Sequence, residues 1–431
     1  MSSTGRLQRY ARAAVLIVPA LAVAAGAMTP AAAAPGGPVT AGAAAAAGRA
    51  TTPADQFLGV SCPADRFCMG VGWYIPRDGV KRPLAETWDG SAWHITLPLM
   101  PSPAPAAVLQ TVSCTSRTAC LAVGNTTTNG DQGIVPGKLF AEKWDGSTWQ
   151  MVPIADPGRS TLAKMSCASA RSCLAVGYRV PVTGPLYRAI SEHWNGTQWS
   201  YVRPRRPQRI SQLLGVSCPG PRNCWAAGWT GPHQVASQRA LTEHWNGTRW
   251  STRPLPGTPR NSQLSSVACP ARARCTAVGV TGFRRQLMLV EDLSGGRWRA
   301  SVLSDKAVNP DNLGLDDVSC RAPRVCSAVT RYISSATGFP TWAIASRGRA
   351  GGFRFQILPA TAAFDDPRDM SCSAHGCTLV GGKGSDDGQG DEFDEGTTLV
   401  RRGTGTSFAP QATPPPPQNG PKVLPIPAGS S

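Results

Sequence analysis

The sequence predicts an all-β fold, a seven-bladed β-propeller built from four-stranded antiparallel blades. Seven similar units follow one another along the 431-residue chain, and their first cysteines lie 51 to 53 residues apart. Each unit carries one cysteine pair, and in the first four units an Asp-Gly or Asn-Gly turn separates two tryptophans. Repeats of this length with four short strands are typical of propeller blades. Outside the N-terminus, no stretch shows a helical period.

The clearest unit is residues 213–256, in which four short strands are expected. Residues 213–218 and 224–228 are apolar runs that favour the first two strands, and residues 240–245 and 250–253 favour the third and fourth. Asn246-Gly247, between the last two strands, is a strong hairpin signal. Cys218 and Cys224 flank the turn between the first two strands, with five residues between them.

The cysteines predict one local disulfide in each blade. An even number of cysteines at regular spacing in an exported chain indicates a disulfide framework, and so short a loop contributes about 2 kcal/mol by chain entropy. The spacing does not suit zinc, which favours closer pairs with further Cys or His nearby. The predicted pairs are Cys62–Cys68, Cys114–Cys120, Cys167–Cys173, Cys218–Cys224, Cys269–Cys275, Cys320–Cys326 and Cys372–Cys377.

Other residues recur at fixed places in the unit. A serine precedes the first cysteine in six units, and Ala268 replaces it in the fifth. Units six and seven lose the tryptophans, and we expect Phe353 and Phe408 to replace them. A catalytic group should occur once, so the recurring glutamates are expected to be structural, and the tryptophan pairs to pack between blades. These glutamates are Glu86, Glu142, Glu192, Glu243 and Glu291.

The repeat pattern VSC…CxAVG…EHWNGTxW resembles that of secreted actinobacterial β-propeller repeat proteins. Its strand order is also similar to the kelch repeat and to the central domain of the galactose-oxidase group. The resemblance covers roughly residues 56–409. It implies a propeller architecture and no particular activity, because a fold does not determine a function.

The ends of the chain predict an exported protein. Residues 1–34 hold three arginines, an apolar run and a small-residue end, which is typical of a secretory signal peptide. Residues 35–55 form an Ala/Gly/Pro linker, residues 56–409 the propeller, and residues 410–431 a Pro-rich disordered tail. We expect a secreted monomer of a bacterial cell envelope, without an integral membrane span after the signal is removed.

The charge favours an anionic partner. The formal net charge is +17, and it is +14 without the three arginines of residues 1–34. A basic secreted protein associates with anionic polymers, glycans or proteins. The sequence has no element that would recognise bases, so nucleic acid is not expected as a partner.

Strand alternation gives the ring two different faces. The disulfide turns and the turns between strands three and four lie on one face, here called the turn face. The loops between strands two and three, and the blade connections, lie on the other, here called the loop face. Variable loops on a rigid scaffold usually carry binding. The expected ligand-binding residues are Trp73, Tyr74, Tyr178, Trp229, Tyr332, Trp342, Arg179 and Arg331; the alternative is that these rings pack between blades.

Acidic residues concentrate in the last two units. Thirteen of the 26 Asp and Glu residues lie between Asp305 and Glu395. If the first strand of each blade is innermost, the aspartates at the beginning of that strand in blades six and seven lie at the mouth of the central channel. Carboxylate oxygens are suitable ligands for Ca²⁺. A solvated acidic loop is the alternative. The possible cation site comprises Asp316, Asp317, Asp365, Asp366 and Asp369. No metal or other cofactor besides Ca²⁺ is expected.

The sequence therefore predicts a secreted, non-enzymatic propeller that binds an extracellular or cell-envelope ligand through the loop face. The alternative is a glycan-active hydrolase or lyase that uses the acidic residues at the channel mouth of blades six and seven. A wall protein with a purely structural role is a third possibility.

Overall fold

The computed structural model describes residues 54–127, 136–180, 187–205, 208–232, 237–282, 286–303, 314–333, 340–349, 351–359, 364–384, 397–404, 407–417 and 423–425. All of them belong to one compact unit, residues 52–431. Within these residues the fold is all-β and consists of seven four-stranded antiparallel sheets and one two-stranded sheet. The predicted signal peptide and almost all of the predicted linker lie outside the described residues. No helix formed by the described residues is long and apolar enough to span a bilayer.

The first four blades each contain strands from a single sequence unit. Blade one comprises β1 (Ala54–Ala64), β2 (Phe67–Ile75), β3 (Arg82–Trp88) and β4 (Trp93–Ile95). Blade two comprises β6 (Ala106–Ser116), β7 (Ala119–Thr127), β8 (Pro136–Trp144) and β9 (Trp149–Val152). Blade three comprises β10 (Ser160–Ser169), β11 (Ser172–Arg179), β12 (Arg188–Trp194) and β13 (Trp199–Tyr201). Blade four comprises β14 (Ile210–Gly220), β15 (Asn223–Gly231), β16 (Arg239–Trp245) and β17 (Trp250–Arg253).

The last three blades repeat the same order. Blade five comprises β18 (Ser262–Ala271), β19 (Arg274–Thr281), β20 (Leu287–Ser294) and β21 (Arg297–Leu303). Blade six comprises β22 (Asp317–Ala322), β23 (Val325–Ile333), β24 (Pro340–Arg347) and β25 (Arg354–Ile357). Blade seven comprises β26 (Phe364–Cys372), β27 (Cys377–Gly384), β28 (Thr397–Thr404) and β29 (Ser407–Gln411).

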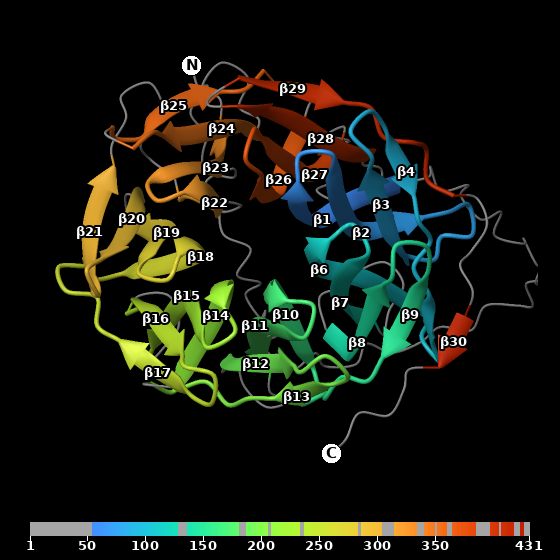
Figure 1. Ribbon diagram of the computed structural model, residues 1–431, viewed down its shortest axis with the longest axis horizontal. Coiled ribbons are helices and arrows are strands. Elements are labelled where there is room, and N and C mark those ends of the chain that lie inside the picture. The colour runs from blue at the N-terminus through green and yellow to red at the C-terminus, as the bar shows by residue number, and fades with distance from the viewer. Residues whose placement is uncertain are drawn as a thin grey trace, which may run out of the picture. The chain divides into compact units, whose positions relative to one another are not determined.

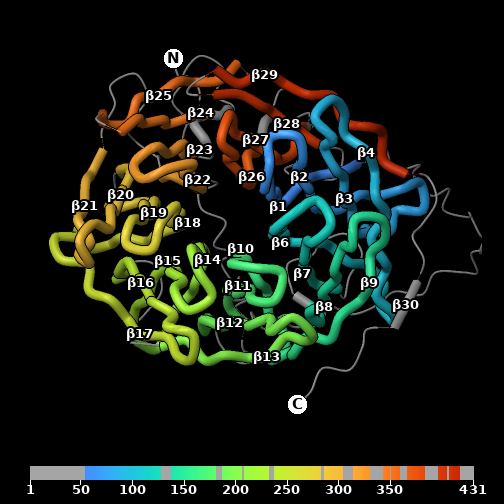
Figure 2. Tube along the Cα trace, viewed as in Figure 1, coloured from blue at the N-terminus to red at the C-terminus, as the bar shows by residue number. Residues whose placement is uncertain are grey.

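The blades form a ring with the first strand of each blade innermost. β1, β6, β10, β14, β18, β22 and β26 surround the centre, and the fourth strands lie at the rim (Figure 1). Figure 2 shows that the chain travels once around the ring, so that blade seven lies beside blade one. The seven-bladed prediction is confirmed, including the four strands expected in residues 213–256.

Disulfides join the predicted partners in all seven blades. The fourteen cysteines, all within the described residues, pair locally across the turn between the first two strands. Seven disulfides indicate an oxidising environment.

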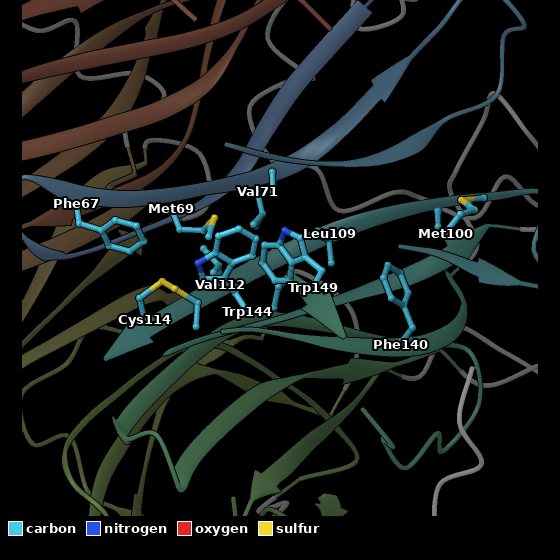
Figure 3. Close-up of a cluster of buried hydrophobic side chains, with 14 residues drawn as sticks. Phe67, Met69, Val71, Met100, Leu109, Val112, Cys114, Phe140, Trp144 and Trp149 are labelled. Atoms are coloured by element: carbon cyan, nitrogen blue, oxygen red, sulfur yellow. A yellow bond between two sulfur atoms is a disulfide. The ribbon is translucent and has the colours of Figure 1, made fainter. Parts of the chain in front are cut away.

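The core lies in the seams between blades, and the tryptophan pairs fill them. Trp144 and Trp149 of blade two have ring centroids 5.5 Å apart and belong to one buried cluster with Phe67, Met69 and other residues of blade one. Figure 3 shows this cluster beside the disulfide of Cys114. Stacked apolar seams explain how a long chain folds without one large core, because each blade packs on its neighbours.

The serine that precedes each first cysteine links neighbouring blades. The backbone N–H of Cys114 donates to Ser61 Oγ at 2.9 Å, and the same bond recurs at 2.9 to 3.0 Å between five further pairs of neighbouring blades. Blade five has Ala268 at this position, which offers no hydroxyl to the next blade. The recurring serine is therefore an inter-blade connector.

The ring closes by side-chain contacts, since blades one and seven do not exchange strands. The backbone N–H of Val60 donates to Asp369 Oδ2 at 2.9 Å, and the guanidinium of Arg402 lies 4.5 Å from the ring centroid of Trp88. In the predicted tail, β30 (Val423–Pro425) pairs in parallel with β5 (Met100–Ser102), outside the blades.

Candidate functional site

A buried charge cluster crosses the central channel. Lys164 comes from β10 of blade three, and its Nζ contacts the carboxylates of Asp369 in blade seven and, at 3.2 Å, of Asp317 in blade six. The two aspartate side chains are 6% and 3% exposed. Figure 1 shows that the three strands face one another around the centre of the ring. The lysine is the counter-charge that makes buried carboxylates tolerable.

A β-bulge in the first strand of the blade directs the side chains of Lys164 and Asp369 toward the channel. The pairing of the first two strands shifts register just before Lys164, and likewise before Asp369. Each aspartate also accepts a backbone N–H from the next blade: Met370 N donates to Asp317 Oδ2 at 2.8 Å, and Val60 N donates to Asp369 Oδ2 at 2.9 Å. The carboxylates therefore point along the ring and into its lumen, where they connect blades.

The two carboxyl groups have different protonation behaviour. Burial raises the pKa of Asp369, and the charge of Asp317 adds to this effect. Burial also opposes ionisation of Asp317, but the charge of Lys164 and hydrogen bonds from Asp369 and Ser266 outweigh it, so its pKa lies below the usual value. The carboxyl groups share one lysine and titrate as a unit.

The remaining predicted cation ligands do not join this cluster. Asp366 is 1% exposed, and its carboxylate contacts Arg368 and accepts a hydrogen bond from Gln56 at 3.2 Å. Asp316 is half-buried at the start of β22, and the side chain of Asp365 lies outside the described residues. No three Asp, Glu, His or Cys side chains converge as a metal site would require in the part of the chain that the structure describes. Calcium binding here stays a prediction.

The recurring glutamates are fully buried in blades one to five. Glu142 Oε2 accepts the backbone N–H of Leu99 at 2.9 Å, and Glu243 Oε2 accepts that of Arg205 at 3.0 Å, both from the connection that precedes the blade. Burial raises the pKa of Glu86, Glu142 and Glu243 to about 8 and that of Glu192 to about 9. These carboxyl groups are thus largely neutral at pH 7.

Three of the rings expected to bind ligand on the loop face are buried, so the alternative that they pack inside the fold holds for them. Trp73, Tyr74 and Trp229 are 4%, 0% and 2% exposed. Trp229 Nε1 donates to Gln212 at 3.1 Å, and Trp73 belongs to a small buried cluster with Ala54 and Val108. The rings are buried because the second strands on which they lie are covered by the neighbouring strands and blades.

The other predicted ligand residues have mixed positions. Tyr178 is half-buried and packs edge-on against Tyr187 with ring centroids 5.3 Å apart, and Arg179 beside it is half-buried. Burial raises the pKa of Tyr178 to about 12. The side chains of Arg331, Tyr332 and Trp342 lie outside the described residues, although the backbones of Arg331 and Trp342 are partners between β23 and β24.

A cavity of about 410 Å³ opens on the loop face between blades four and five. Arg239 and Arg260 are exposed at this cavity, and no acidic residue is among the described residues that line it. Gln208 Oε1 and Gln238 Nε2 are buried and have no hydrogen-bond partner among the described residues. The lining residues are Gln208, Pro232, Ser237, Gln238, Arg239, Arg260 and Asn261.

The cavity presents two cations, and the unpaired atoms Gln208 Oε1 and Gln238 Nε2 are buried behind its surface. An unpaired buried amide costs free energy. The volume lies within the range of small-molecule sites. The sequence analysis predicted that the loop face carries binding, and Arg239 lies in one of its variable loops. No sequence pattern indicated Gln208, Arg260 or Asn261, because they lie in connections between blades whose sequences differ from one another.

The fold and this site define a disulfide-stapled seven-bladed propeller with a basic cavity on its loop face. Comparison of solved structures found the GH74 xyloglucanase of Xanthomonas campestris, which is 15% identical with a TM-score of 0.51 and covers 82% of this chain and 53% of its own. An ancestral GH74 enzyme is 11% identical with a TM-score of 0.53 and covers 83% of this chain and 49% of its own. This chain therefore spans about half the length of those enzymes.

A third similar structure is YCF48 bound to a D1 peptide, which is 12% identical with a TM-score of 0.46 and covers 77% of this chain and 91% of its own. No protein-family model matches the chain, and no curated protein matches it. At these identities the likeness shows the propeller fold alone. A fold does not determine a function, so the propeller leaves the enzymatic status open.

Proposed function

We propose that this protein is a secreted, non-catalytic propeller that binds an acidic extracellular glycan in the loop-face cavity. The observation that carries the proposal is the lining of that cavity, in which Arg239 and Arg260 are exposed, amide residues such as Asn261 lie beside them and no described residue is acidic. Guanidinium groups bind carboxylates as forks, and amides suit sugar hydroxyls. Acidic glycans carry both kinds of group.

The distribution of charge supports an anionic ligand. Glu86, Glu142, Glu192 and Glu243 have pKa values above 7 because they are buried, so they contribute little negative charge at pH 7. The exported protein is consequently more positive than the formal net charge of +14 that remains without residues 1–34. Such a field attracts polyanions and raises their association rate.

Secretion is part of the proposal. A signal-like segment in residues 1–34 and seven local disulfides favour an extracellular or envelope location. The pattern resemblance to secreted actinobacterial propellers points in the same direction.

The channel carboxylates support binding over glycan hydrolysis. The paired carboxyl groups of retaining glycosidases lie about 5 Å apart, and those of inverting enzymes lie farther apart. Asp317 and Asp369 are 3% and 6% exposed, and both contact the Nζ of Lys164. Carboxylates that are buried and already paired with a lysine are poorly placed to act on a glycosidic bond.

The test is binding of polygalacturonate, with its fully methyl-esterified form as the uncharged control, by isothermal titration calorimetry at 50 and 300 mM salt. We expect the acid polymer alone to bind, and Arg239→Ala with Arg260→Ala to weaken binding roughly a hundredfold, at about tenfold per charge-assisted contact. Arg299→Ala, an exposed arginine of blade five outside this cavity, is the matched control.

Equal affinity of the double variant and the control would reject the cavity as the site. Release of new reducing ends from the polymer, abolished by Asp317→Asn with Asp369→Asn, would instead establish the hydrolase or lyase. Binding that disappears at 300 mM salt in every variant alike would mean adsorption by overall charge alone.

A further inference from the structure

The tryptophan that packs between blades in the first half of the ring is absent from blades five, six and seven. The second cysteine of each blade lies opposite one position of the third strand. That position is Trp88, Trp144, Trp194 and Trp245 in blades one to four, Leu293 in blade five, Arg347 in blade six and Gly403 in blade seven. In blade two this tryptophan packs against blade one (Figure 3).

Two consequences follow from the substitutions in blades six and seven. Arg347 extends toward blade five, where its guanidinium bonds Asp292 at 2.7 Å and Thr276 at 2.5 Å and lies 4.7 Å from the ring centroid of Phe353. Gly403 has no side chain, and its partner on β29, Phe408, is buried with Met370 and Leu379 between blades six and seven, as expected for a residue that replaces a tryptophan. A cavity of about 250 Å³ remains there, on the turn face.

The cavity is basic. Arg321, Arg347 and Arg354 line it, and none of the described lining residues is acidic. Arg321 and Arg354 are exposed, and no described carboxylate lies within ion-pair distance of either. Arg347 is only 8% exposed, and its Nε has no hydrogen-bond partner among the described residues, although its other nitrogens bond Asp292.

We propose that this cavity, here called the seam pocket, binds a sugar-sized oxyanion. At roughly 30 Å³ of liquid volume per water, it holds about eight waters, or one sugar ring with its acid group. The exposed guanidiniums of Arg321 and Arg354 would donate charge-assisted hydrogen bonds to the anion, and the positive charge of Arg347 lies behind them. This site is on the opposite face from the loop-face cavity and goes beyond the proposed function.

The test uses D-glucuronate, with D-glucose as the uncharged control, on full-length protein that carries Arg239→Ala and Arg260→Ala. Those two changes remove the loop-face arginines, so the result does not depend on whether the loop-face cavity binds glycan. We expect saturable glucuronate binding by calorimetry and none of glucose. Adding Arg321→Ala and Arg354→Ala should weaken it by on the order of a hundredfold.

Two further variants sharpen the test. Arg299→Ala is the control and should leave binding unchanged. Arg299 is exposed and holds the position in blade five that Arg354 holds in blade six, because its strand partner Asp292 corresponds to Ser346, the strand partner of Arg354. Gly348→Glu should reduce binding at least tenfold, because a side chain at Gly348 enters open space beside the arginines and supplies a competing carboxylate. Absence of saturable glucuronate binding, or equal binding in all variants, would overturn the proposal.

Discussion

Replacement of Lys164 should destabilise the ring strongly and in a pH-dependent way. In Lys164→Met, Asp317 and Asp369 keep their burial, at 3% and 6% exposure, but lose their shared counter-charge. Removal of one partner from a buried ion pair typically costs about 3–5 kcal/mol, because a charge is left uncompensated. The free energy of unfolding at pH 8 should therefore fall by about this amount.

The pH dependence follows from the carboxyl groups. Without the lysine, the pKa of Asp369, which burial already raises, should rise further. A carboxyl whose folded pKa exceeds its unfolded pKa favours the folded state at low pH, and this stabilisation is lost as pH rises through the folded value. The destabilisation should therefore be smaller at pH 5 than at pH 8, since protonation of the pair relieves the unpaired charge at pH 5.

Urea denaturation followed by tryptophan fluorescence at both pH values measures these differences. Lys143→Met, at an exposed lysine of blade two, should change stability by no more than about 0.5 kcal/mol. Addition of Asp317→Asn and Asp369→Asn to Lys164→Met should recover most of the loss by removing the unpaired charges. A loss below about 1 kcal/mol at pH 8 would refute the role assigned to the cluster.

Three further predictions concern the scaffold. Ala268→Ser should supply the missing inter-blade acceptor to Cys320 N–H and raise the free energy of unfolding by about 1 kcal/mol, measured by urea titration; a loss would contradict the connector role. Glu192→Gln should flatten the decline in stability between pH 5 and 8, since its pKa of about 9 makes the folded state lose stability as pH rises; an unchanged slope would argue against a neutral buried carboxyl. Cys218→Ser with Cys224→Ser should cost about 2 kcal/mol, and a loss above about 5 kcal/mol would show that the bridge holds more than its short loop.

The repeated features of the sequence were sufficient to predict the fold. Cysteine spacing, hairpin turns and tryptophan pairs each occur several times, so seven independent copies of one pattern agree on strand order and on the innermost strand. The role of the serine before each first cysteine was not predicted, because the hydrogen bond joins residues about fifty positions apart and no local pattern indicates it.

The candidate sites were harder to predict because they lie where the repeat changes. Trp73 and Trp229 sit beside variable loops and suggested exposed rings, but strand pairing and blade packing bury them. The role of Lys164 could not be predicted, because no local sequence pattern marks a single lysine in this strand. Its two partners lie about 150 and 205 residues away in the chain. The loop-face cavity depends on non-repeating connections, whose path only the folded chain reveals.

A crystal structure of the protein with an acidic oligosaccharide such as tetragalacturonate would show directly whether the loop-face cavity binds glycan. We expect sugar density in the loop-face cavity, with a carboxylate on Arg239 or Arg260. Density confined to the central channel beside Asp317 and Asp369, or an empty cavity at saturating ligand, would contradict this expectation.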